Sequence, residues 1–222
     1  MRPILVFIFA VHLIGCGSKR ERKPHRIQEA TTQAAVSSPK LEYVVTSPTI
    51  TDFEVLEVVL SDLLRSPEFQ GYPARGGSKT QIVLDLRTIQ NPYPLDGAKD
   101  VIDRMAEKGL TLTDDLVRDF IRRSYGSISL DGFSTRNPNI LITDVEIAVP
   151  KGRFGIELEF PKAFPSAKGW VHTRLPGYSA DGQYAYVECR LHPAEHGASA
   201  NYLLRKENGR WTVSWRRVAY FA

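Results

Sequence analysis

Two histidines and a glutamate near the C-terminus stand in an order that zinc peptidases use. His192, Glu195 and His196 fit the pattern H-x-x-E-H, in which two histidines on one face of a helix bind zinc and the glutamate acts as a base. Pro193 and Gly197 bracket the stretch between two strand-like runs, so we expect a hairpin loop and not a helix. The three residues form a candidate metal site, but we expect neither zinc catalysis nor a cofactor.

Four carboxylates form a second candidate site. Residues 141–149 and 154–160 alternate apolar and polar side chains around a Pro-Lys-Gly turn, which is the pattern of a β-hairpin. In the register that pairs the apolar side chains, the outer face carries Asp144, Glu146, Glu157 and Glu159. Like charges placed opposite each other destabilise a hairpin by up to ~1 kcal/mol per pair. We expect compensation from a divalent cation, from a cationic partner or, above all, from arginines of later strands: Arg174, Arg190, Arg205, Arg216 and Arg217.

The sequence argues against a phosphate-binding loop and against a serine nucleophile motif. In the loop 71–80 the lysine follows the second glycine two positions later than a phosphate-binding loop requires, and a strand-like run follows it instead of a helix. The chain has no Gly-x-Ser-x-Gly motif.

Cys189 shares a strand face with Val187 and Leu191, so we expect a buried core thiol. A net charge of +4 without a basic stripe gives no reason to expect nucleic-acid binding.

An apolar run near the N-terminus ends in a cysteine. Residues 4–14 follow Met1-Arg2, and a helix of this length rises only ~16 Å, too short for a ~30 Å hydrocarbon core. The run has the layout of a signal peptide. Leu13-Ile14-Gly15-Cys16 resembles the lipobox of bacterial lipoproteins. The resemblance implies cleavage before Cys16 and lipid on its thiol and new amino group. Gly17 and Ser18 follow the cysteine with no Asp, a pattern that resembles that of Gram-negative lipoproteins sorted to the outer membrane, so we expect anchoring there, facing the periplasm.

Composition divides the chain into three parts. Residues 1–15 form the expected signal peptide. Residues 16–45 carry basic side chains followed by a tract rich in serine, threonine, alanine and glutamine. Because they contain few large apolar residues, they cannot bury enough surface to fold, and we expect a disordered tether. Residues 46–222 show the apolar periodicity of a single globular domain.

Within this domain, periodicity indicates helices first and strands afterwards. The first half is expected to contain a strand over 82–86 and helices from the Thr51-Asp52 cap to Pro67, over 101–109 and over 113–126. After the hairpin, further strands are expected over 170–175, 183–191, 200–207 and 210–220. Short turns join these strands. We therefore predict an α+β domain whose N-terminal helices pack on one face of a C-terminal antiparallel β-meander.

Three stretches of the C-terminal third, residues 164–169, 175–187 and 201–211, resemble the pattern YPGS-G, SRVGF, A-VYV and Y-LL-K-GKW of a group of uncharacterised exported bacterial proteins. The resemblance implies a Tyr-Leu-Leu strand, a tight turn and a Trp strand, and it carries no activity. The order of helices and meander is also similar to that of NTF2-like domains.

Together these features predict the cellular location of the protein better than its biochemical function. We expect a lipid-anchored cell-envelope protein, held to the membrane by its N-terminal lipid, with a non-catalytic binding or accessory domain and an envelope protein as its candidate partner. The alternative is a small envelope hydrolase or metal-dependent enzyme that uses the sheet face or the loop from His192 to His196.

Overall fold

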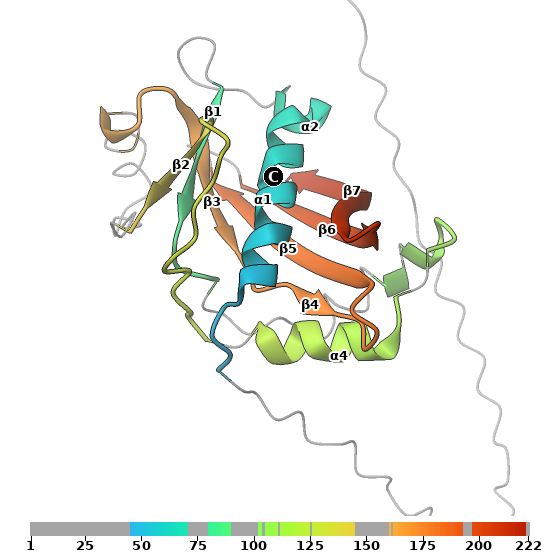
Figure 1. Ribbon diagram of the computed structural model, residues 1–222. Coiled ribbons are helices and arrows are strands. Elements are labelled where there is room, and N and C mark those ends of the chain that lie inside the picture. The colour runs from blue at the N-terminus through green and yellow to red at the C-terminus, as the bar shows by residue number, and fades with distance from the viewer. Residues whose placement is uncertain are drawn as a thin grey trace, which may run out of the picture. The chain divides into compact units, whose positions relative to one another are not determined.

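The computed structural model of the chain (Figure 1) describes residues 45–70, 80–89, 102–103, 105–110, 112–124, 126–144, 160, 162–192 and 197–220. All of them belong to one unit, Lys40–Ala222. It contains the helices α1 (Ile50–Arg65), α2 (Pro67–Gln70) and α4 (Asp114–Arg123). Its strands are β1 (Gln81–Asp85), β2 (Ile140–Thr143), β3 (Ala167–Thr173), β4 (Gly177–Tyr178), β5 (Tyr184–His192), β6 (Ala198–Glu207) and β7 (Arg210–Tyr220). Within the described ranges, no helix is both long and apolar enough to cross a bilayer.

The strands form one mixed sheet in the order β2-β1-β3-β5-β6-β7, with β4 paired to β5. The C-terminal strands β5, β6 and β7 are the expected antiparallel meander, and the predicted α+β class is confirmed. The sheet as a whole is not antiparallel, because β1 lies between β2 and β3 and runs parallel to both. Long connections separate these three strands in the sequence, and such connections permit parallel pairing. The likeness to NTF2-like domains stays a prediction.

Helix α1 begins two residues earlier than the sequence indicated. Its N-cap is Thr49, whose side chain accepts a hydrogen bond from the backbone N–H of Asp52 at 3.3 Å, while the Asp52 carboxylate accepts from the backbone N–H of Thr49 at 2.6 Å. This reciprocal capping box satisfies two backbone donors that a helix end otherwise leaves open. The helix stops at Arg65, just ahead of Pro67, and it buries Val55, Leu56, Val59, Leu60, Leu63 and Leu64.

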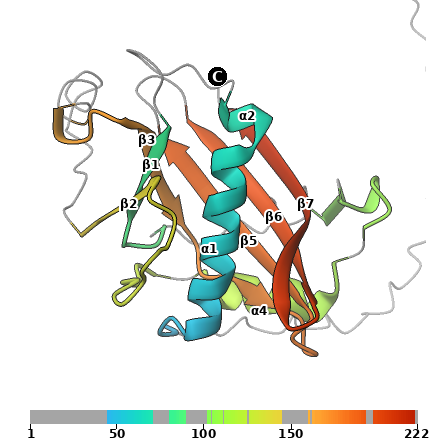
Figure 2. The same cartoon turned by 45° about the horizontal axis from the view of Figure 1, so that its top comes forward.

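Helices cover both faces of the sheet, whereas the sequence suggested one. The core under α1 contains Val187 of β5 and Tyr202 of β6, and the core under α4 contains their neighbours Tyr186 and Leu203. Adjacent residues of a strand point to opposite faces, so α1 and α4 lie on opposite sides. Figures 1 and 2 show α1 across the front of the sheet and α4 beside β4 at its lower end. Residues 184–187 of β5 form an apolar run without alternation, which is typical of a strand that is buried on both faces.

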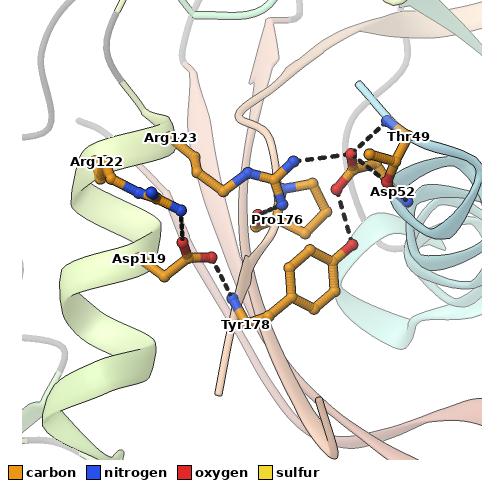
Figure 3. Close-up of polar contacts among 7 residues, drawn as sticks. All are labelled: Thr49, Asp52, Asp119, Arg122, Arg123, Pro176 and Tyr178. Atoms are coloured by element: carbon orange, nitrogen blue, oxygen red, sulfur yellow. Dashed lines mark hydrogen bonds and ion pairs between the residues drawn. The ribbon is translucent and has the colours of Figure 1, made fainter. Parts of the chain in front are cut away.

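A buried polar network joins α1, α4 and β4 (Figure 3). The fully buried carboxylate of Asp52 accepts hydrogen bonds from Arg123 Nη2 and from the Tyr178 hydroxyl, both at 2.8 Å. Arg123 Nη1 also donates to the carbonyl of Pro176 at 2.8 Å. Burial, with the negative charge of Asp52 added, raises the pKa of the Tyr178 hydroxyl, which stays protonated and donates. Since its members point inward and bind one another, we assign this network to the scaffold.

Candidate functional site

A row of polar side chains crosses the sheet on the face opposite α1. The register pairs Asp85 with Thr143 on one side, and pairs His172 with Arg190 and Arg190 with Ser199 further along. His172 follows Val171, the partner of Leu84, so it stands beside Asp85, and the two side chains share a hydrogen bond. A second row on the same face contains Arg174, Glu188, Asn201 and Arg217. We call these two rows together the polar belt. Its first row consists of Thr143, Asp85, His172, Arg190 and Ser199, and its second row consists of Arg174, Glu188, Asn201 and Arg217.

Apolar clusters flank the polar belt on both sides. Val83 lies two residues before Asp85 on β1, and Trp170 lies two residues before His172 on β3. Phe160 and Phe164 pack against them. Beyond the second row lie Tyr186, Leu203 and the α4 residues that cover them. The belt therefore interrupts what is otherwise an apolar sheet face. Charges in such a partly shielded place interact more strongly than charges in open water.

Asp85 anchors the first row. Its carboxylate is fully buried and accepts hydrogen bonds from His172 Nε2 at 2.9 Å, from Arg87 Nη2 at 2.9 Å and from Arg87 Nε at 3.1 Å. Burial alone raises the pKa of this carboxyl, but the hydrogen bonds from His172 and Arg87 outweigh burial and hold the pKa well below its usual range. Because the ionised carboxylate only accepts, Nε2 of His172 carries the proton. Asp85 thus fixes the orientation of one imidazole and one guanidinium.

Glu188 anchors the second row. Its Oε2 accepts a hydrogen bond from Arg174 Nε at 2.7 Å, and its Oε1 accepts one from Arg190 Nε at 3.1 Å. Arg174 is fully buried and also donates to the carbonyl of Ser124, directly after α4, at 3.1 Å. The side chain of Arg190 is 31% exposed. Arg174 therefore supports the belt from inside, whereas Arg190 reaches the solvent.

His192 lies at the edge of the belt. Its ring stacks on Trp170 with centroids 5.4 Å apart and an interplanar angle of 16°, and it meets the ring of His172 edge-on at 5.1 Å. Burial, together with the positive charges of His172 and Arg190, lowers the pKa of His192 from 6.5 to about 4. This imidazole is therefore neutral at neutral pH.

The candidate metal site is only partly described. His192 ends β5 and Ala198 begins β6, so the first histidine of the motif lies on a strand and not on a helix, one residue beyond the strand expected over 183–191. Glu195 and His196 lie outside the described residues. Among the residues that the structure does describe, no group of three or more histidine, cysteine, aspartate or glutamate side chains could hold a metal ion.

The other candidate residues fare as follows. Asp144 is exposed directly after β2, while Glu146, Glu157, Glu159 and Cys16 lie outside the described residues. Two arginines expected to compensate those carboxylates, Arg174 and Arg190, bind Glu188. Arg216 pairs with Asp62 at 3.0 Å and with Glu68 at 3.2 Å, which ties β7 to α1 and α2. Cys189 is fully buried on the α1 side, and burial raises the pKa of its thiol, so the predicted core role is confirmed.

Sequence reasoning missed the residues at the centre of the belt. Asp85 and Glu188 each had a local signal, because one ends and the other interrupts an apolar strand. A carboxylate in such a position needs a buried partner. The partner His172 lies on β3 and the partner Arg174 directly follows it, and the sequence alone does not show which strands are neighbours.

A groove on the α1 side of the domain is a weaker candidate for a binding site. An open groove of about 430 Å³ lies between α1 and the start of β7, lined by Glu57, Asp62, Arg65 and Trp211 among others. The acidic group of Asp62 is already tied to Arg216. Acidic and basic side chains line the groove together, so its charge does not point to one class of ligand. The polar belt is the better candidate.

The belt has the chemistry of binding more than that of covalent catalysis. Among the described residues, no serine, threonine or cysteine hydrogen-bonds His172 or His192, and Cys189 faces the opposite side of the sheet. A nucleophile needs such a contact with its base. No protein-family model matches the chain, and no characterised protein or solved structure is similar enough to count as a match. Function must therefore be inferred from these residues.

Proposed function

We propose that the chain is a lipid-anchored protein of the bacterial cell envelope, and that its α+β domain is a non-catalytic binding module whose ligand or partner contacts the polar belt. The lipobox-like Leu13-Ile14-Gly15-Cys16 supports the anchor. The absence of Asp after Cys16 favours the outer membrane, with the domain facing the periplasm, and the basic, serine- and threonine-rich tract after Cys16 provides the tether.

One observation carries the binding role. Two buried carboxylates, Asp85 and Glu188, hold the partly exposed side chains of His172 and Arg190 in place on an otherwise apolar sheet face. Buried ion pairs are a poor way to stabilise a fold, since apolar residues of similar volume serve as well or better. Departures from an apolar core concentrate at functional sites. We therefore assign the belt to ligand contact.

A hydrolase is the second candidate, and the pair Asp85–His172 is the observation that favours it. A carboxylate that orients an imidazole at 2.9 Å is the arrangement of a general base, and a neutral second imidazole, His192, stands beside it. Assays of the full chain with ester and phosphoester substrates test this reading. Turnover that disappears in both His172→Asn and Asp85→Asn would establish an enzyme in place of a binding module.

The anchor is tested by acyl labelling and cell fractionation. Wild type should take up labelled fatty acid and sediment with membranes, whereas Cys16→Ser should lose both properties. Cys189→Ser is the matched control, because that thiol is fully buried and should leave labelling unchanged. Continued labelling of Cys16→Ser would contradict the anchor.

The binding role is tested by site-specific photocrosslinking in cells. A photoreactive residue replaces Ser199, which is half-buried in the belt, or Glu54, which is exposed on α1 as a control. We expect one reproducible adduct at position 199 that is absent at position 54 and disappears when Arg190→Gln is added. The same adducts at both positions, or none at either, would contradict a binding role for the belt.

A further inference from the structure

We propose that the first row of the polar belt binds an oxyanion, a carboxylate or phosphate group, between His172, Arg190 and Ser199. This inference rests on the proposed function, because it names the class of ligand for the same belt.

The three side chains stand on neighbouring strands at one level of the sheet. His172 of β3 is paired with Arg190 of β5, and Arg190 is paired with Ser199 of β6. Directly opposite residues of antiparallel strands have Cβ atoms about 5 Å apart. An imidazole, a guanidinium and a hydroxyl therefore converge from one row. The Arg190 guanidinium and the Ser199 hydroxyl can each donate a hydrogen bond to an oxygen, and His172, whose Nε2–H is held by Asp85, can donate one through Nδ1 when its imidazole carries two protons.

Arg190 is the cation that the scaffold needs least. Asp85 already has the two-pronged guanidinium of Arg87, and Glu188 already has Arg174 at 2.7 Å. Arg190 is the second arginine on Glu188 and uses only its Nε, at 3.1 Å. Within the described ranges, its two terminal nitrogens make no hydrogen bond to another residue. Those two nitrogens form the fork that binds carboxylate and phosphate oxygens in pairs.

The surroundings favour an anion over other ligands. Arg190 is 31% exposed and His172 24% exposed, so a ligand can reach both, while the flanking Trp170 and Tyr186 limit the screening by water. A cation placed in this row would face the Arg190 guanidinium directly. The negative charges of Asp85 and Glu188 are already matched by Arg87 and Arg174, which reduces their repulsion of an incoming anion. A small anionic group therefore suits the row best.

Calorimetric titration of the full chain, purified in detergent, tests the inference. Inorganic phosphate and acetate are the probes, in a chloride buffer. We expect saturable binding of at least one probe. Because a charge-assisted hydrogen bond contributes strongly at a shielded site, Arg190→Gln should weaken binding at least ~ten-fold. Ser199→Asp should abolish it, since the introduced carboxylate occupies the Arg190 fork. Arg205→Gln is the matched control, an arginine 57% exposed on β6, and it should leave binding unchanged.

The outcomes separate this inference from the proposed function. Tighter binding of phosphate assigns a phosphate-bearing ligand, and tighter binding of acetate assigns a carboxylate. The inference is overturned if wild type binds neither probe, if Arg190→Gln binds like wild type, or if Arg205→Gln weakens binding equally. Should the photocrosslink at position 199 persist in any of these cases, the belt is still a binding surface and only its oxyanion ligand is wrong. If neither probe binding nor the crosslink at position 199 is observed, both the oxyanion ligand and the binding role of the belt are contradicted.

Discussion

At the scale of single residues, Asp85 shows how a buried carboxylate makes the stability of the fold depend on pH. Its pKa in the folded protein lies below the ~3.9 of an unfolded chain, because His172 and Arg87 hydrogen-bond the ionised form. The unfolded state therefore takes up this proton first as the pH falls. The stability that Asp85 contributes is complete above about pH 4 and is lost below it.

Asp85→Asn should remove this dependence on acid. At pH 7 we expect the free energy of unfolding to fall by about 1–3 kcal/mol, because the amide keeps one acceptor and loses the charge. Between pH 4.5 and pH 3 the variant should lose less stability than wild type does. Urea unfolding at several pH values measures both quantities. Parallel curves for the two proteins over that interval would contradict the role given to Asp85.

His192 should act in a different pH window. Its folded-state pKa is about 4, against an ordinary value of 6.5, so the unfolded state binds the proton first as the pH falls below 6.5. Stability is complete above pH 6.5 and is lost towards pH 4. At ~1.4 kcal/mol per pH unit, reduced for partial exposure, wild type should lose about 1–2 kcal/mol between pH 7 and pH 5.

The variant His192→Phe isolates this effect. A phenyl ring can keep the stack on Trp170 but cannot take up a proton, so the variant should hold its stability between pH 7 and pH 5 better than wild type. Thermal unfolding at the two pH values provides the measurement. An equal loss of stability in both proteins would show that another group titrates in this window.

At the scale of elements, the network of Asp52, Arg123 and Tyr178 connects α1, α4 and β4, which the sequence keeps far apart. Arg123→Met should lower the free energy of unfolding by about 3–5 kcal/mol, because it leaves the Asp52 carboxylate buried without its cation. Arg122→Met is the matched control on the same helix. Arg122 is 50% exposed in its ion pair with Asp119, so its loss should cost less than ~1 kcal/mol. Similar losses in denaturant unfolding would contradict this account.

The elements themselves could largely be predicted from the sequence. Strands β5, β6 and β7 begin and end within two residues of their expected bounds, because alternation and turn residues are local signals. The start of α1 was placed at Thr51-Asp52 and lies instead at Thr49, since Thr, Asp and Ser all cap helices and only geometry decides between neighbours. Element boundaries thus depend on details that composition does not resolve.

At the scale of the whole molecule, the position of β1 was the feature that the sequence concealed. Residues 82–84 are an apolar run like that of many buried strands, and nothing local says that they insert between β2 and β3. Parallel pairing joins segments that are distant in the chain, so it follows from the packing of the entire domain. The polar belt depends on that order, because Asp85 meets His172 only when β1 and β3 are neighbours. This is why the belt could not be predicted.

The belt's place between two apolar clusters leads to a last prediction about stability and function. Glu188→Leu alone should destabilise the domain by about 3–5 kcal/mol, because it leaves the fully buried Arg174 without its carboxylate. The double variant Arg174→Met with Glu188→Leu should recover at least half of that loss, since two apolar side chains can join the flanking clusters. Chemical denaturation of wild type, both single variants and the double variant gives the coupling energy. A double variant as unstable as Glu188→Leu would mean that the fold itself requires this ion pair. Recovery of stability, with loss of the crosslink at position 199, would mean that the belt is kept for what it binds.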